Sequence, residues 1–494
     1  MSINHSFNNY ISMEIKDLKP QAIWYYFDQI TKVPRPSKKE GKIRAFLKQF
    51  ATDHQLTCKE DKTGNILISK PATKGMEKKK PIVLQAHMDM VCEKNNGTVH
   101  NFETDPIQTY IDGDWVKAKG TTLGGDNGIG MAAELAVLAA DNIEHGPVEC
   151  LFTVDEETGL TGAFALEEGF FTAKALLNLD SEDEGEIFVG CAGGIDTTSK
   201  FIYQPTPAPA EYHYVKIGVK NLRGGHSGGD IHEGRGNANK ILNRFLWNTA
   251  KKMDMVLCKI DGGNLRNAIP REAWAIIGIP QSQKETLRID LNLYTAEIEN
   301  ELGSIEPNIA LILESAEPQQ MCIDKKTATN LMNALYACPH GVIAMSKEIP
   351  GLVETSTNLA SVKMVDDNAI VVATSQRSSI ESAKYDIAHT VESVFLLAGA
   401  TPSHGEGYPG WKPNLNSEIM KTAVKTHKEL FGEEPAIKAI HAGLECGLFL
   451  TKYPGLDMIS FGPTMRGVHS PDEQLSISAV EKFYNHLLAI LKNA

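Results

Sequence analysis

Short apolar runs that end in acidic or histidine residues constrain the fold of this chain more than any other feature. PIVLQAHMDM ends in His87 and Asp89, and LFTVDEETG ends in three acidic residues, Asp155 to Glu157. LLNLDSED repeats the pattern with Asp180. Open α/β sheets bind ligands at the carboxyl ends of their strands. The runs therefore predict an α/β fold with a polar site along one sheet edge.

The chain from Leu18 to about Gly194 alternates strand-like and helix-like segments, which is typical of an α/β layer. Asp126 follows a glycine turn and precedes a helix-forming segment. Strands are predicted at Asn65–Ser69, Ile82–Ala86, Val148–Val154 and Leu176–Leu179, and a helix at Asn127–Ala140.

Two stretches rich in proline and glycine divide the chain, one near Ala210 (FIYQPTPAPAEYHYVKI) and one near residue 400 (AGATPSHGEGYPGWKPN). The segment between them is predicted to be a compact α+β unit. Strands are expected at Tyr212–Val219, Ala273–Ile279 and Ala369–Thr374, and helices at Asn237–Ala250, Glu381–Leu397 and, at the chain end, Ser478–Lys492.

Charge and hydropathy exclude several classes of partner. The formal net charge is −13, which disfavours nucleic acid and anionic membrane surfaces. No apolar run approaches the roughly 18 residues of a membrane span. The N-terminal sequence has no secretory-signal pattern, so we expect a cytoplasmic protein. The sequence contains neither a GxGxxG motif after a strand nor a P-loop, so no motif supports nucleotide binding.

Each polar motif alone has a second interpretation. His87 and Asp89 project to one side of an extended strand, so the carboxylate can orient a metal-binding imidazole. Asp126, taken alone, is more typical of a helix N-cap than of a metal ligand. The three acidic residues after LFTV form either a solvated turn or a cation site. His469, in MISFGPTMRGVHSPDE, is by itself more typical of a structural histidine. Together, histidines and carboxylates favour zinc.

In this order and spacing the motifs resemble the zinc-dependent peptidases of the M20 family, and within it the group of bacterial aminoacyl-histidine dipeptidases. The resemblance covers nearly the whole chain. It rests on QAHMDMVCEKN, GTTLGGDNGIGMA, TVDEETGLTGA, LLNLDSED, NLRGGHSGGDIHEGRGNANK, HAGLECG and RGVHSPDE. It implies a two-domain α/β fold, with a catalytic domain over residues 1–209 and 401–494 and a smaller lid domain over residues 210–400.

The resemblance also implies a site with two zinc ions per subunit, for which manganese or cobalt could substitute. Asp126 would bridge the ions, in two-metal sites typically about 3.5–4 Å apart. Two roles are implied for residues that do not bind metal: Asp89 would orient a ligand histidine, and Glu156 would act as general base. The implied metal ligands are His87, Asp126, Glu157, Asp180 and His469.

Four residues are expected to bind substrate. His226 in the GGHSGG loop corresponds to a family histidine that contacts the oxyanion or the substrate, in some members from a partner subunit; the alternative is a purely local hydrogen bond. Asn267 in NLRNAIP matches a substrate contact. Arg377 in ATSQRSS suits a free α-carboxylate, with a surface salt bridge as the alternative. Gly443 in HAGLECG could give a close backbone contact, with His441 and Glu445 lining the pocket.

The sequence is thus expected to encode a dipeptidase acting on unblocked dipeptides, including Xaa-His, with a possible homodimer through the lid. Two alternatives are an amidohydrolase acting on N-acyl amino acids or longer peptides, and a catalytically silent peptide- or metal-binding protein. His232 and His404, in polar glycine-rich surroundings, are expected to be exposed loop residues.

Overall fold

The chain forms two compact units in a computed structural model that describes residues 14–366 and 368–494. Unit 1 contains the chain up to Gly190 together with Pro413–Lys438 and Leu448–Ala494, and unit 2 contains Cys191–Lys412 and Ala439–Gly447. Much of the N-terminal segment examined for a secretory signal, residues 1–13, lies outside the described residues. No described helix is long and apolar enough to cross a membrane.

Unit 1 is built on an eight-stranded sheet whose central strands run parallel. β3 lies between β6 and β7, and all three end at the same edge because they are parallel. In spatial order the strands are β1 (Thr57–Glu60), β2 (Ile66–Lys70), β6 (Val148–Thr153), β3 (Ile82–His87), β7 (Ala175–Asn178), β23 (Asp457–Ser460), β8 (Glu186–Cys191) and β22 (Ala436–Ile440). β3 and β6 are buried along their whole length, as expected when helices cover a parallel sheet.

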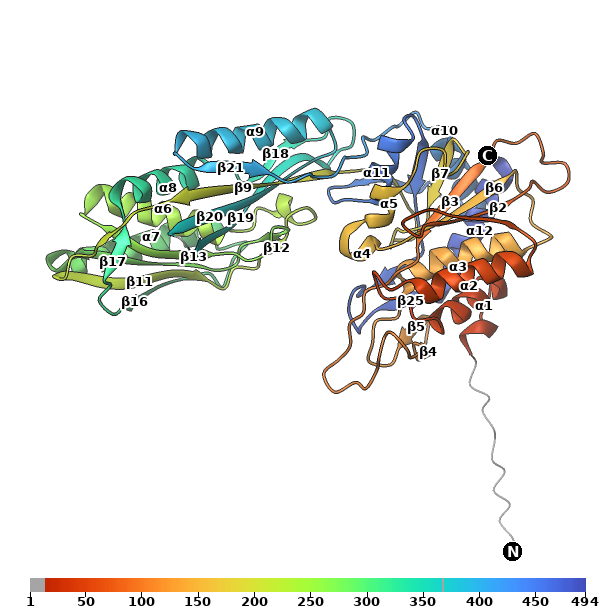
Figure 1. Ribbon diagram of the computed structural model, residues 1–494, viewed down its shortest axis with the longest axis horizontal. Coiled ribbons are helices and arrows are strands. Elements are labelled where there is room, and N and C mark those ends of the chain that lie inside the picture. The colour runs from red at the N-terminus through yellow and green to blue at the C-terminus, as the bar shows by residue number, and fades with distance from the viewer. Residues whose placement is uncertain (1–13, 367) are drawn as a thin grey trace, which may run out of the picture. The chain divides into compact units, whose positions relative to one another are not determined.

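Helices pack on this sheet, with α3 against β3 and α1, and with α10 against β23 and α12 (Figure 1). The helices are α1 (Gln21–Thr31), α2 (Gly41–Asp53), α3 (Gly125–Ala139), α4 (Glu156–Gly159), α5 (Thr161–Ala165), α10 (Glu418–Phe431) and α12 (Ile477–Asn493); α11 (Glu445–Lys452) crosses the unit boundary. A separate four-stranded sheet contains β24 (Met465–Arg466), β25 (Gln474–Ser476), β5 (Trp115–Ala118) and β4 (Thr109–Asp112).

Unit 2 is a nine-stranded sheet covered by four helices (Figure 1). Its strands are β16 (Ala310–Ser315), β11 (Tyr212–Lys220), β15 (Ala273–Pro280), β13 (Val256–Gly262), β19 (Val353–Val365), β20 (Ala369–Ser378), β9 (Gly193–Ile202) and β21 (Thr401–His404), with β18 (Gly341–Met345) beside β19. The helices are α6 (Ala238–Lys252), α7 (Lys284–Leu302), α8 (Lys325–Ala337) and α9 (Glu381–Leu397). One continuous apolar core joins these helices to the sheet.

The predicted α/β class, with a second unit inserted into the sequence of the first, is confirmed. The predicted strands and helices match β2, β3, β6, β7, α3, β11, α6, β15, β20, α9 and α12 to within a few residues. The insertion, Cys191–Lys412, extends beyond residues 210–400 at both ends. The reason is strand pairing: β9 pairs with both β20 and β21, so all three belong to one sheet.

The prediction that His404 is an exposed loop residue is wrong. This histidine is the last residue of β21, paired with Thr197 of β9, and its side chain is 24% exposed rather than free in a loop. The glycines that suggested a loop begin one residue later. His232 does lie in an exposed short turn, the 3-10 helix Ile231–Glu233.

Candidate functional site

The carboxyl ends of β3, β6 and β7 carry the acidic and histidine residues that the sequence singled out. His87 is the last residue of β3, Glu156 and Glu157 open α4 directly after β6, and Asp180 follows β7. Asp126 is the second residue of α3, with non-helical backbone angles (φ −80°, ψ 113°). Parallel pairing therefore brings together groups that are far apart in the sequence.

Asp126 lies at the centre of this cluster because its two carboxylate oxygens face different histidines. Oδ1 lies 2.9 Å from His87 Nε2, and Oδ2 lies 3.1 Å from His469 Nε2. Asp180 Oδ1 is 3.4 Å from the same His87 nitrogen, and Glu157 Oε2 is 3.0 Å from the same His469 nitrogen. The result is two three-residue groups that share Asp126, each with donor atoms within 4.8 Å of one another.

The donor chemistry of these two groups fits divalent metal ions. Glu157 Oε1 is buried without a hydrogen-bond donor, and buried Asp180 Oδ1 has only the His87 nitrogen at 3.4 Å beside it, a costly state for ionised carboxylates unless a cation is bound. Each group offers one imidazole nitrogen and carboxylate oxygens, a ligand set that zinc accepts. All five predicted ligands thus converge, and they can hold metal.

In the absence of metal, bound protons neutralise part of the negative charge of the cluster. Hydrogen bonds to Asp126 and Glu157 raise the pKa of His469 to about 11. Burial raises the pKa of Asp180 to about 7, against the opposing effect of His87. Burial would also raise the pKa of Asp126, but hydrogen bonds from His469 and His87 lower it overall. The cluster is therefore built to hold positive charge.

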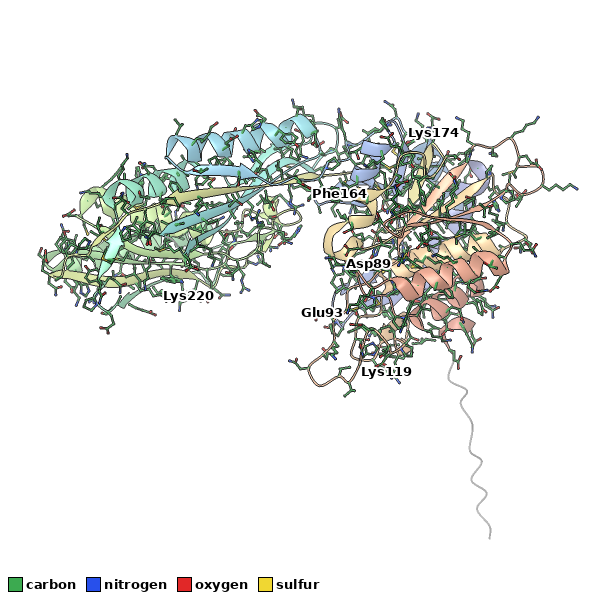
Figure 2. The ribbon with its side chains drawn as sticks, in the orientation of Figure 1. Asp89, Glu93, Lys119, Phe164, Lys174 and Lys220 are labelled. Carbon is green, nitrogen blue, oxygen red and sulfur yellow. The ribbon has the colours of Figure 1, made fainter. Side chains whose placement is uncertain are left out.

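Asp89, labelled in Figure 2, links the first histidine to helix α4. Its Oδ1 lies 3.3 Å from His87 Nδ1, and its carboxylate accepts hydrogen bonds from the backbone N–H groups of Glu156 (3.0 Å) and Glu157 (3.2 Å) and from Ser37 Oγ (2.8 Å). Burial would raise the pKa of Asp89, but the bonds from His87 and these other donors lower it to about 2. An ionised Asp89 fixes the His87 tautomer with Nε2 directed at the cluster.

Two buried residues that the sequence analysis did not identify hold the loop before Asp126. Glu473 accepts four backbone N–H bonds, from Leu123 (2.7 Å), Gly124 (3.0 Å), Gly125 (2.7 Å) and Asp126 (3.3 Å). Gly124 has a left-handed φ of +69°, and a Cβ there would lie 2.5 Å from the buried Arg35 guanidinium. The loop therefore needs glycine at this position.

Arg35 itself is 2% exposed and donates to three backbone carbonyls, those of Met88 (3.2 Å), Asp89 (2.5 Å) and Gly124 (2.5 Å). It thereby joins the segment after β3 to the loop before Asp126. No local pattern in the sequence marks either Arg35 or Glu473, because each acts on segments far from it along the chain.

A cavity of about 440 Å³ in unit 2 is lined by two of the predicted substrate-binding residues, Asn267 and Arg377. Arg377 is 8% exposed and donates from Nη1 to Tyr408 Oη over 2.7 Å, while its buried Nε has no acceptor. The alternative of a surface salt bridge is therefore wrong. Gly443 packs on the same tyrosine, since a Cβ there would lie 2.8 Å from the Tyr408 ring.

His226, at the end of the short strand β12 (Gly225–His226), is exposed and held by its own loop. Its Nδ1 accepts backbone N–H bonds from Gly228 (3.3 Å) and Gly229 (3.1 Å), so the neutral ring carries its proton on Nε2. Although the residue is exposed, the neighbouring protein partly desolvates its ring, and this desolvation together with the charge of Arg377 lowers the pKa of this histidine. A neutral ring with an outward N–H is a hydrogen-bond donor.

His441 is buried and pairs with Ser356, whose Oγ lies 2.7 Å from Nε2. Burial and the charge of Arg377 lower the pKa of His441 to about 3. Glu445 is also buried, at the start of α11. Neither residue is among those that line the 440 Å³ cavity.

The fold and the two residue groups define a two-unit α/β protein with a candidate metal centre. The chain belongs to peptidase family M20/M25/M40, whose sequence pattern matches residues 83–493. It is 47% identical to the cytosol non-specific dipeptidase of Escherichia coli K12, over 97% of this chain and 99% of that protein.

The chain also resembles solved structures. The chain matches the aminoacylhistidine dipeptidase of Vibrio alginolyticus with a TM-score of 0.91 and 47% identity, over 97% of this chain and 98% of that one. It matches the aminopeptidase PepT of Bacillus cereus with a TM-score of 0.56 and 18% identity, over 96% and 99% of the chains, a likeness of fold alone.

Proposed function

We propose that this protein is a zinc-dependent dipeptidase that hydrolyses unblocked dipeptides with broad side-chain tolerance, including Xaa-His. The observation that carries the proposal is the 47% identity, over nearly the full length of both chains, to a relative named for non-specific dipeptidase activity. The convergence of five potential metal ligands in two groups that share Asp126 supports it.

Two zinc ions per subunit would be held by the shared carboxylate of Asp126, one with His87 and Asp180 and the other with Glu157 and His469. Bound there, zinc would supply Lewis acidity and lower the pKa of a water molecule to near neutrality. Manganese or cobalt could replace zinc, since the same nitrogen and oxygen donors bind both. Asp89 acts from behind His87 as a positioning residue.

Glu156 is proposed as the general base. It opens α4 beside the metal ligand Glu157, and its backbone N–H is anchored on Asp89. Its carboxylate would accept a proton from the attacking water and pass it to the leaving amine. Two adjacent glutamates would then divide the work, one binding metal and the other moving the proton.

Unit 2 is proposed to bind the α-carboxylate and the reacting carbonyl of the substrate. Arg377 would pair with the free α-carboxylate, because its guanidinium is buried, has an unpaired Nε and already lines a cavity with Asn267. The His226 Nε2–H would donate to the carbonyl oxygen as negative charge develops there. Asn267 and Gly443 would contact the substrate beside Tyr408.

Two further properties belong to the proposal. A cytoplasmic location agrees with the name of the Escherichia coli relative. A homodimer formed through unit 2, the proposed lid, is the assembly that the family resemblance favours.

The substitution Glu156→Gln tests the assignment of the base. We expect the variant to keep its zinc and lose about 10²- to 10⁴-fold in kcat, the usual contribution of a general base. Glu168→Gln, an exposed glutamate nearby in the sequence, is the matched control and should keep both. Unchanged hydrolysis by zinc-loaded Glu156→Gln protein would refute the role.

A further inference from the structure

Three potential metal ligands converge at one edge of the unit 2 sheet, and none of them has been given a role above. His389 and Glu392 lie on α9, three residues apart and so on one face of the helix. His404 lies at the end of the neighbouring edge strand β21. One donor atom from each lies within 4.8 Å of the other two.

The tautomer of His404 is set by a buried hydrogen-bond chain. Thr197 Oγ1 donates to Gln376 Oε1 over 2.7 Å, so it can only accept from His404 Nδ1, 2.9 Å away. The Gln376 amide is itself fixed, since its Nε2 donates to Thr374 Oγ1 over 2.8 Å. His404 therefore carries a proton on Nδ1. Metal-binding histidines are held in this way, with the second ring nitrogen donating to a protein oxygen.

The remaining nitrogen of His404 faces a carboxylate. Nε2 lies 3.2 Å from Glu392 Oε2, and two lone pairs at this distance repel unless a proton or a cation lies between them. Two ligands of a tetrahedral zinc are about 3.3 Å apart when the metal–ligand bonds are about 2.0–2.1 Å. The His404 and Glu392 donors are already at that spacing, and a donor atom of the exposed His389 lies within 4.8 Å of donor atoms of both residues.

We propose that His389, Glu392 and His404 form a zinc site in unit 2, with solvent in the fourth position. Two imidazoles and one carboxylate are a ligand set that zinc accepts. The side chains of His404 and Glu392 are 24% and 34% exposed, so the ion can enter from solvent.

The proposed zinc site lies next to a segment that lines the cavity of unit 2. β21 continues directly into Gly405–Tyr408, and these four residues line the cavity with Arg377. A zinc ion that joins α9 to the end of β21 would hold the start of this segment. The site would therefore stabilise one wall of the cavity without contacting what binds there.

Zinc stoichiometry tests the proposal. The full-length protein and its variants would be dialysed at one fixed free zinc concentration, and zinc per chain measured by mass spectrometry. We expect His389→Ala and Glu392→Gln each to bind one zinc fewer than the wild type. Asp386→Asn, an exposed acidic residue on the same helix, should lose none. The test compares zinc per chain in each variant with zinc per chain in the wild type, so the result does not depend on how many ions unit 1 holds.

Hydrogen exchange supplies a second readout. Zinc should slow amide exchange in residues 401–408 of the wild type and of Asp386→Asn, but not of His389→Ala. Because His389 is exposed and leaves the His404–Thr197 bond intact, this variant should fold normally. Equal zinc content in the wild type, His389→Ala and Glu392→Gln would overturn the proposal.

Discussion

Replacing Glu473 by glutamine tests whether the loop before Asp126 is held from the far end of the chain. The Glu473 carboxylate accepts backbone N–H bonds at 2.7 to 3.3 Å from four consecutive residues, with two donors on each oxygen. A glutamine keeps one acceptor oxygen and turns an NH₂ group toward two of the donors. Each buried donor left unpaired costs about 1–3 kcal/mol, so we expect the loop to be less stable by about 2–6 kcal/mol.

Hydrogen exchange of the amides of residues 123–126 measures this loss locally. At about 1.4 kcal/mol per tenfold, the lower bound predicts at least about 30-fold faster exchange in Glu473→Gln. Zinc affinity should fall as well, because the same loop positions Asp126.

Glu149→Gln is the matched control. Glu149 is also buried and accepts backbone bonds, from Thr172 (2.8 Å) and Ala173 (2.8 Å), but it does not hold the loop. This variant should retain zinc affinity and slow exchange at 123–126. Unchanged exchange in Glu473→Gln, or equal loss of zinc in both variants, would refute the reasoning.

Two further predictions concern binding and pH. Arg377→Lys should raise KM for dipeptides by about 10- to 100-fold, since a charged hydrogen bond contributes about 1.5–3 kcal/mol; an equal effect on C-terminally amidated substrates would contradict carboxylate binding. His486 is buried, which lowers its pKa to about 4 although its Nε2 donates to the Ala423 carbonyl. In the unfolded chain His486 binds a proton near pH 6.5, whereas in the folded protein it stays neutral, so this residue alone should lower the free energy of unfolding by about 2 kcal/mol between pH 7 and 5. Other buried histidines, such as His441, titrate in both proteins, so urea titrations should show a decrease that is smaller by about 2 kcal/mol in His486→Gln than in the wild type, and equal decreases would contradict the prediction.

Much of the fold and the polar cluster could be predicted because the information is local. An apolar run specifies a buried strand, and the residue at its end, such as His87 or Asp180, is placed by the strand itself. The alternation of such runs with helical segments then predicts which strand ends share an edge. The helix at Glu381–Leu397 was predicted to the residue, since its apolar positions recur with helical spacing.

The rest depends on contacts between distant segments that no local pattern records. Glu473 stands in a polar Ser-Pro-Asp-Glu segment typical of an exposed turn, yet it is 3% exposed because it binds the N-terminus of α3. Arg35 reaches backbone carbonyls at Asp89 and Gly124. The glycines beside His404 predict a loop, whereas Thr401–His404 pairs with β9, a contact between distant segments that the local sequence does not record.

The central claim is tested most directly by removing metal from the purified protein and measuring hydrolysis before and after zinc is returned. The panel would contain Ala-His, β-Ala-His and an N-acetyl amino acid. We expect no cleavage without metal and zinc-restored cleavage of the free dipeptides alone. Cleavage of only the acylated substrate, or tight zinc binding without turnover of any dipeptide, would contradict the proposed function.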